Sequence, residues 1–122
     1  DIDFSAAGYF TAYFARLILE RKFSAGVDLI KVEVPSHATP TTEWQTTRLS
    51  RLRYYEPVPA KRDSWDIPGA ITYKESASLE DEDKDSDVYV LRKKKMVAVT
   101  PLNLDMTARV KLSDFEKFLR GK

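Results

Sequence analysis

The first part of the chain has apolar residues at the three- and four-residue spacing of a helix. The pattern runs from Phe4 to Phe23, and its most continuous side carries Phe10, Phe14, Leu17 and Ile18. Aromatic residues also occupy other sides of the first three turns. A helix that is apolar nearly all round is buried on several faces rather than one. We therefore expect other parts of the protein to cover more than one side of this helix.

Alternation of apolar and polar residues predicts strands further along the chain. The first runs from Val27 to Val34, and Pro35 ends it. The runs Glu43 to Leu49, Tyr54 to Val58 and Ala70 to Lys74 follow, with a turn-like segment at 66–69. These three runs together predict a long, irregular β-hairpin arm from Glu43 to Lys74.

The last third of the chain predicts a mixed set of elements. Glu75 to Lys84 is an acidic surface loop, and Ser86 or Asp85 can cap a short helix that includes Tyr89 and Leu91. A buried-type strand from Met96 to Thr100 is stopped by Pro101. The terminal helix opens with a capping box, Ser113-x-x-Glu116, and its apolar side carries Phe115, Phe118 and Leu119.

A chain of 122 residues is long enough for about one small domain. We expect the α/β class (α+β as an isolated segment). The chain would divide into a helix and strand that complete a core (1–42), the hairpin arm with the acidic loop (43–84), and a short helix, strand and terminal helix (85–122).

The net charge of +1 gives no general attraction to nucleic acid or anionic membrane. The absence of cysteine excludes disulfides and thiolate sites and fits a cytoplasmic location. No apolar run is long enough to span a membrane. The start, Asp1-Ile2-Asp3, is typical of a fragment rather than of a signal peptide.

Two clusters of charge are candidates for chemistry. Six carboxylates crowd the acidic run from Glu80 to Asp87, and Asp81, Asp83 and Asp85 have the first spacing of an EF-hand loop. The rest of such a loop is missing, because Ser86 stands at the position of its tight-turn glycine and Arg92 at that of its closing glutamate. A solvated loop therefore competes with a Ca²⁺ or Mg²⁺ site, and it is the simpler interpretation.

Basic and aromatic residues interleave along the predicted arm. Arginines beside tyrosines are what a single-stranded nucleic-acid surface uses, and the competing interpretation is an amphipathic hairpin that pairs with another subunit. The residues are Arg48, Arg51, Arg53, Tyr54, Tyr55, Lys61 and Arg62. A second basic cluster, 92–95, sits where a short helix ends and complements its dipole. His37, the only histidine, has no acid and nucleophile beside it in the sequence.

Three stretches, in order, resemble the C-terminal part of the SurE-type survival proteins, a family of metal-dependent nucleotidases. They are Thr47-Arg48-Leu49-Ser50-Arg51 with Tyr55, Asp85 to Leu91, and the stretch from Val97 to Ala108 that includes Thr-Pro-Leu and Leu-Asp. The sequence departs from the family at Lys31 and Glu33, where the family usually has Asn, at Lys95 (Gly) and at Ala98 (often Ser).

The resemblance implies a Rossmann-like fold for the parent protein, with a divalent metal, Mg²⁺ or Mn²⁺, that polarises the phosphate and activates water. The family's acidic metal-binding motif does not occur here, so the chain carries no catalytic, cofactor-binding or metal-binding residue of that kind. The resemblance also implies a homo-oligomer, a dimer or tetramer, joined through the arm and the terminal helix. Candidate interface residues are Trp44, Arg48, Leu49, Tyr54, Tyr55, Trp65, Phe115 and Phe118.

The main hypothesis is therefore that this chain is the C-terminal portion of a nucleotidase that acts on nucleoside monophosphates. In that hypothesis the segment completes the core and builds the oligomer. It is inactive without the N-terminal nucleotidase part. The alternative is a stand-alone, non-enzymatic interaction module whose arm binds a protein or RNA.

Overall fold

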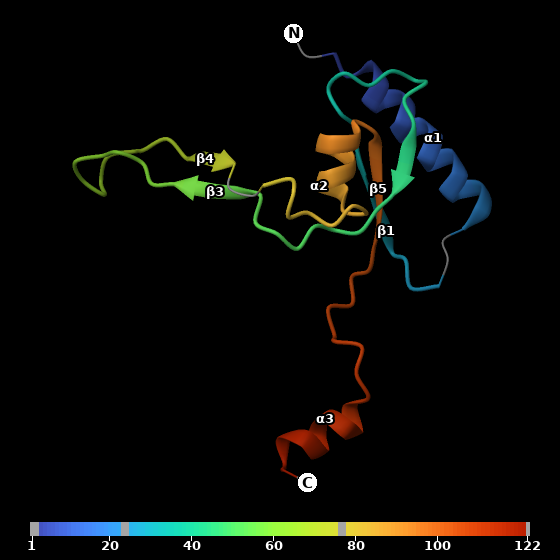
Figure 1. The fold of residues 1–122 in the computed structure, drawn as a ribbon, viewed down its shortest axis with the longest axis vertical. Helices are drawn as coiled ribbons and strands as arrows, with labels where there is room; N and C mark the ends of the chain where they lie inside the picture. Colours follow the sequence, from blue (N-terminus) through green and yellow to red (C-terminus); the bar gives the residue numbers. More distant parts are fainter. Residues whose placement is uncertain (1–2, 23–24, 76–77, 122) are drawn as a thin grey trace.

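The computed structural model describes residues 3–22, 25–75 and 78–121, and these form a small α/β body with two projections (Figure 1). The elements, in order, are α1 (Ser5–Arg21), β1 (Leu29–Glu33), β2 (Trp44–Thr46), β3 (Tyr55–Val58), β4 (Thr72–Glu75), α2 (Asp87–Tyr89), the π-helical turn η1 (Val90–Lys94), β5 (Val97–Leu102) and α3 (Leu112–Leu119). The mixture of helices and strands confirms the predicted fold class. The described helix stops short of Phe23, which lies outside the described residues.

The body is organised around β5, the middle strand of a three-stranded sheet in the order β1-β5-β2. β1 pairs with β5 antiparallel, with Lys31 opposite Thr100, whereas β2 pairs with β5 parallel, with Trp44 opposite Val97. The prediction that the run from Glu43 to Leu49 belongs to the arm is therefore wrong. Its hydrogen-bonding partner is a strand more than fifty residues later, which alternation within the run could not reveal.

β5 continues through Pro101 to Leu102, so the prediction that this proline stops the strand is also wrong. Val97 donates its N–H to Glu43, and Val99 accepts from the N–H of Thr47, so the odd-numbered residues of β5 direct their backbone groups toward β2. Pro101, with the same parity, lies beyond Thr46, the last paired residue of β2. A residue without an N–H is tolerated there because no partner strand needs the donor.

The two faces of β5 are covered by different helices. Phe10 and Phe14 of α1 pack against Val97 and Val99, and Ile30 and Val32 of β1 border the same cluster. Because side chains alternate along a strand, Ala98 and Thr100 point to the opposite face, where α2 and η1 lie (Figure 1). Both are buried there, as is Val90.

Helix α1 buries only part of its apolar circumference. Ala6, Phe10 and Phe14 are buried against the sheet, but Phe4, Tyr9 and Leu19 remain exposed. Within the described residues the helix is therefore buried on one face, and the covering of its other faces stays a prediction. The helix ends where Lys22 takes a positive φ, and Gly26, also at positive φ, turns the chain back toward β1.

The arm consists of β3 and β4, an antiparallel pair in which Tyr55 stands opposite Glu75, and it leaves the body sideways (Figure 1). Every residue of β4 is exposed. The second projection is α3, which is carried away from the body by the segment that follows β5 and has no buried residue among those described. Both projections therefore present side chains that their own surroundings do not cover.

Two predicted caps have different outcomes. Ser86 caps α2 as expected, because its Oγ accepts a hydrogen bond from the N–H of Tyr89 at 3.1 Å. The prediction of a capping box at the terminal helix is wrong. Helix α3 begins at Leu112, so Ser113 lies inside its first turn, and no side chain caps the helix. The Ser-x-x-Glu spacing occurs there without the backbone geometry that a cap needs.

We expect Phe10→Ala to lower the free energy of unfolding by about 3–5 kcal/mol, because the ring is 2% exposed and its loss leaves a cavity between α1 and β5. Urea unfolding followed by circular dichroism measures the change. The matched control is Phe118→Ala, whose ring is 74% exposed and whose loss should change the value by about 0.5 kcal/mol or less. Equal effects of the two substitutions would contradict this description of the core.

Candidate functional site at the root of the arm

The three sequence stretches that resemble a known family meet at one place, where the chain leaves the sheet for the arm. The hydroxyls of Thr47 and Thr100 lie 2.8 Å apart, and both residues are buried. The backbone N–H of Arg48 donates to Asp85 at 2.9 Å, and its carbonyl accepts from the N–H of Asp87 at 2.8 Å. The segments before and after the arm therefore run side by side and close its base.

A buried carboxylate, that of Asp87, connects this base to the sheet. Asp87 is 2% exposed and is the first residue of α2. Its Oδ1 accepts from the N–H of Ser50 at 2.8 Å and from the N–H of Val88 at 2.9 Å. Its Oδ2 accepts from the ammonium group of Lys31, which also lies 2.9 Å from Glu33. One carboxylate thus joins β1, the start of the arm and α2.

The electrostatics of this group favour the charged forms. Burial by itself raises the pKa of Asp87, but the hydrogen bonds from Lys31 and from the N–H of Ser50 outweigh it and bring the pKa below its ordinary 3.8. Burial likewise lowers the pKa of Lys31, and its hydrogen bonds to Asp87 and Glu33 raise it above its ordinary 10.5. Each partner therefore stabilises the ionised state of the other.

A second buried carboxylate lies inside the acidic run. Glu82 is 6% exposed, and it accepts hydrogen bonds from the hydroxyls of Ser50 at 2.8 Å and Ser86 at 2.9 Å. The expectation of a fully solvated acidic loop is wrong at Glu82 and Asp87, because donors from the base of the arm compensate both carboxylates. Asp81, Asp83 and Asp85 of the run are exposed, as expected.

Aromatic and charged side chains pack where the arm joins the body. The ring of Tyr55 contacts those of Tyr54 and Tyr73 edge-on, with centroids 4.7 and 5.0 Å apart. Arg92 donates to the Tyr55 hydroxyl at 2.7 Å, pairs with Glu75 at 3.3 Å, and stands 5.2 Å from the centre of the Tyr54 ring. These contacts join both strands of the arm to η1 and hold the arm to the body.

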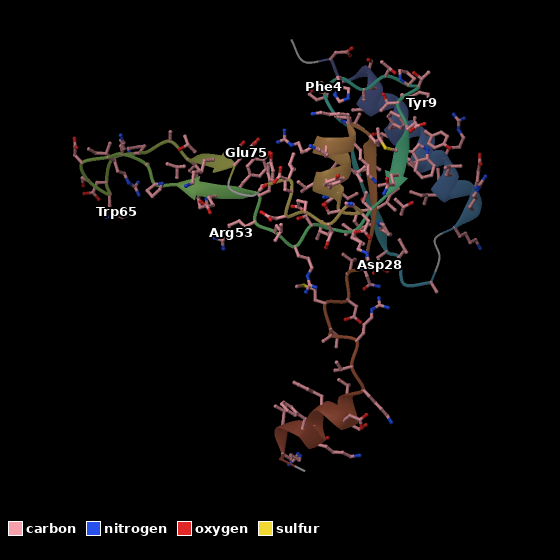
Figure 2. All side chains as sticks on the ribbon, in the orientation of Figure 1. Phe4, Tyr9, Asp28, Arg53, Trp65 and Glu75 are labelled. Atoms are coloured by element: carbon pink, nitrogen blue, oxygen red, sulfur yellow. The ribbon has the colours of Figure 1, made fainter. Side chains whose placement is uncertain are left out.

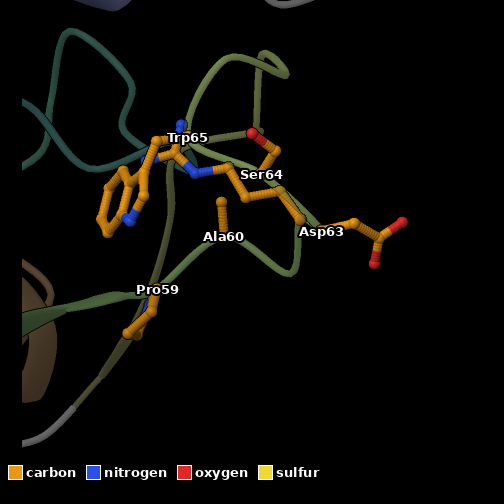
Figure 3. A pocket seen from close by; sticks show the side chains of 6 residues that line it. Pro59, Ala60, Asp63, Ser64 and Trp65 are labelled. Carbon is orange, nitrogen blue, oxygen red and sulfur yellow. The ribbon is translucent and has the colours of Figure 1, made fainter.

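The far end of the arm carries an open hollow of about 360 Å³ beside Trp65 (Figure 3). The guanidinium of Arg62 stacks over the indole at 4.1 Å, yet Trp65 remains 86% exposed. Gly69 lets the turn close here, because a Cβ at this position would lie only 2.5 Å from that of Ala60. The lining combines the apolar Pro59, Ala60 and Trp65 with the polar Arg62, Asp63 and Ser64, and the hydroxyl of Ser64 donates to Asp66 at 3.3 Å.

The predicted interface residues do not form one patch. Trp44 lies on the sheet, with its ring 5.4 Å from that of Phe14, whereas Trp65 lies at the far end of the arm (Figure 2). Tyr54, Tyr55 and the half-exposed Leu49 are near the root, and Arg48 there is paired with Asp85. Phe115 and Phe118 stack on α3, at a centroid distance of 6.2 Å, and both are exposed.

The basic residues are partly engaged within the chain. Arg92 and Lys94 contact neighbouring side chains, including a hydrogen bond from Lys94 to Gln45 at 2.8 Å, and the cluster 92–95 lies at the end of η1 as predicted. His37 lies on the surface, and the partner of its ring among the described residues is the carbonyl of Lys95, at 3.3 Å from Nε2. No helix within the described ranges is long and apolar enough to cross a membrane.

The sequence alone did not identify Lys31, Ser50 and Glu82 as members of this site. Lys31 stood out only as a departure from the family pattern, where Asn is usual. A charged residue facing inward from a half-buried strand is a signal for a buried partner, because an unpaired ammonium there would be costly. The partner, Asp87, is 56 residues away and could not be identified without the fold.

No family model matches the chain, but individual proteins do. It is 39% identical over 118 residues to 5'-nucleotidase SurE of Thermococcus kodakarensis, an alignment that covers 97% of the chain and 45% of that protein. It is 40% identical over 116 residues to the protein of the same name from Thermococcus gammatolerans, with 95% and 42% covered. The chain thus spans less than half the length of the curated relatives that it matches.

We expect Asp87→Asn to lower the free energy of unfolding at neutral pH by about 1.5–3 kcal/mol, because a neutral amide cannot compensate Lys31. A lowered folded-state pKa means that the carboxylate stabilises the fold above pH 3.8 and loses this contribution as the pH falls through the folded-state value. The deficit of the variant should therefore shrink below that pH. Urea unfolding at several pH values tests this.

The control for this experiment is Asp85→Asn, which removes an exposed ion pair with Arg48. It should cost less than about 1 kcal/mol, because exposed pairs contribute little. If the two asparagine variants behaved alike at every pH, the proposed role of the buried carboxylate would be wrong.

Proposed function

Because this chain, over the portion that it spans, belongs to the family of SurE 5'-nucleotidases, we propose that it is the C-terminal portion of an enzyme that hydrolyses phosphate monoesters of nucleoside monophosphates. The sequence identity to relatives of that name carries the proposal. The meeting of three family-like stretches at the root of the arm supports it, because each stretch has a defined contact there.

The metal that the resemblance implies does not fit the residues of this chain. Among the described residues, no group of three or more histidine, aspartate, glutamate or cysteine side chains could hold a metal ion. The two buried carboxylates among the described residues, Glu82 and Asp87, already accept hydrogen bonds from Ser50, Ser86 and Lys31. A Mg²⁺ or Mn²⁺ ion of the parent protein would therefore be bound by residues outside this chain.

The part played by this segment is to complete the core and to assemble subunits. Exposed aromatic rings on and beside α1 offer apolar surface to the rest of the parent protein (Figure 2). Phe4 borders a hollow beside Val32, and Tyr9 borders another beside Trp44. The tip of the arm and the apolar side of α3 offer separate surfaces to a second subunit. A dimer or tetramer joined through these two projections accounts for side chains that the chain does not bury itself.

The alternative, a stand-alone module that binds RNA, receives less support from the contacts. Arg92 is engaged by Tyr55 and Glu75, Arg48 by Asp85, and Arg62 by the indole of Trp65. Stacking bases would have to compete with these contacts. A cytoplasmic location remains a prediction from the sequence.

We expect the 122-residue chain alone to show no phosphatase activity, and the complete parent protein to hydrolyse nucleoside monophosphates with Mg²⁺ or Mn²⁺. The reason is that the described residues contain no group of three or more side chains that could hold the metal ion. Phosphate release from both proteins, purified in parallel, is the measurement. Metal-dependent turnover by the chain alone, retained through further purification, would overturn the proposal that activity requires the rest of the parent protein.

We also expect the parent protein to be oligomeric at micromolar concentration, as measured by light scattering. Phe118→Asp should weaken the assembly about tenfold or more, because it places a charge on the exposed apolar side of α3. Lys117→Ala, on the same helix and with an exposed side chain, should leave the assembly unchanged. A strictly monomeric parent protein would refute the assembly role.

A further inference from the structure

The tip of the arm holds a tryptophan ring in place but leaves it uncovered. Trp65 follows Ser64 in a turn that closes with a hydrogen bond from the N–H of Ile67 to the Ser64 carbonyl at 3.3 Å. The guanidinium of Arg62 stacks on the indole at 4.1 Å and also donates to the carbonyl of Ile67 at 3.4 Å. Arg62 therefore ties the indole to the turn, although 86% of Trp65 stays exposed.

The loop that carries the indole is itself held by close contacts. The hydroxyl of Ser64 accepts a hydrogen bond from the N–H of Asp66 at 3.3 Å. Ala60 and Gly69 approach so closely that a Cβ on the glycine would lie 2.5 Å from that of Ala60. A binding surface that is ordered before its ligand arrives loses less entropy on binding than a loose one.

The hollow of about 360 Å³ beside this ring has walls that suit a flat, uncharged group. Pro59 and Ala60 border it together with the indole, and the carboxylate of Asp63 points away from the indole (Figure 3). Residues 61–66 contain two basic and two acidic side chains, whose charges cancel. A ligand of this hollow is therefore held by its ring rather than by a charge.

We propose that this hollow binds a single nucleobase, stacked on the face of Trp65 that Arg62 leaves open. A guanidinium covers one face of an indole, so the second face remains for another planar ring. Every nucleobase offers such a ring, and stacking on an aromatic side chain tolerates any base. The choice of a nucleobase among planar rings rests on the proposed function, which brings nucleoside monophosphates to the parent protein.

The site takes one base of a nucleoside or mononucleotide rather than a strand of nucleic acid. A single strand is bound by successive aromatic rings along a basic groove. Trp65 is the only aromatic residue in the stretch 59–71. The rings of Tyr55 and Tyr73, in the two strands of the arm, contact each other with centroids 5.0 Å apart. The tip thus offers one stacking position and a balanced charge.

A second hollow at the tip leaves room for a subunit contact. Its volume is about 450 Å³, and its lining includes Val58, Pro68 and Ile71. Ile71 is 91% exposed, so this hollow presents an apolar side chain that another subunit could cover. A contact there would leave the hollow beside Trp65 free for a base.

Fluorine NMR of the complete parent protein, labelled with fluorotryptophan, reports on the indole directly. The Trp65 signal is identified by its absence from the variant Trp65→Phe. We expect adenosine, which has no phosphate to hydrolyse, to shift this signal in a saturable way and to leave that of Trp44 unchanged. Ribose 5-phosphate, which has no base, should not shift it. A tenfold increase in salt should change the adenosine affinity by about twofold or less, because the charges at the tip cancel.

Phosphate release from adenosine monophosphate, measured on the same preparation, separates this inference from the proposed function. Hydrolysis without an adenosine-dependent shift of the Trp65 signal would overturn the inference and leave the proposed function standing. A saturable shift without hydrolysis would support the base site and overturn the proposed function. The absence of both would overturn both.

Two further results would overturn the choice of ligand. An adenine oligonucleotide that binds about 100-fold or more tightly than adenosine, with a steep salt dependence, would identify a strand of nucleic acid. A Trp65 signal that changes on dilution of the protein but not with adenosine would identify a second copy of the chain.

Two exposed prolines of the tip provide matched variants. Pro59 lines the hollow beside Trp65, whereas Pro68 lines the second hollow instead. Pro59→Ala removes part of an apolar wall and should weaken adenosine binding about threefold or more, whereas Pro68→Ala should leave it unchanged. The reverse pattern would place the base in the second hollow and overturn the site proposed beside Trp65.

Discussion

The arrangement of this molecule depends on one buried carboxylate, that of Asp87. A charge removed from water must be compensated by other charges or hydrogen bonds, or its cost falls on the stability of the fold. Here the compensation comes from Lys31 in β1, from the N–H of Ser50 at the start of the arm, and from the first turn of α2. Because the three donors belong to segments far apart in the sequence, satisfying this one group brings the sheet, the arm and the helix together.

This dependence explains how a long arm can keep a defined direction. A two-stranded ribbon has no core of its own, so its orientation is set where it joins the body. Ser50 is held at that point by Asp87 through its backbone and by Glu82 through its hydroxyl. On the other side of the root, Arg92 contacts both Tyr55 and Glu75, one on each strand of the arm. A surface at the tip, such as that of Trp65, is thereby presented at a set position relative to the sheet.

The sequence predicted the elements better than their pairing. The periodicity of α1, the alternation of β1 and the cap at Ser86 are local signals, and the structure contains all three. The partner of β2 is not a local property, since three alternating residues fit a hairpin as well as a sheet. Pro101 was misleading because its effect depends on whether a neighbouring strand needs its N–H. The contacts of the site also depend on partners that are distant in the sequence. The charges of the acidic run are visible in the sequence, but the burial of Glu82 depends on hydroxyls supplied by two other segments.

The chain buries few apolar side chains and leaves many large ones exposed, so its uncovered surfaces bear on its stability. In the part of the chain that the structure describes, the cluster between α1 and the sheet contains four buried side chains, Phe10, Phe14, Val97 and Val99, with a few half-buried neighbours. A small core offsets little of the entropy lost on folding, and small domains are marginal for this reason. Meanwhile the outer side of α1, the tip of the arm and α3 keep large apolar side chains exposed to water. Under the proposed function, a larger, assembled protein covers these surfaces, and their burial adds to the stability of this small body.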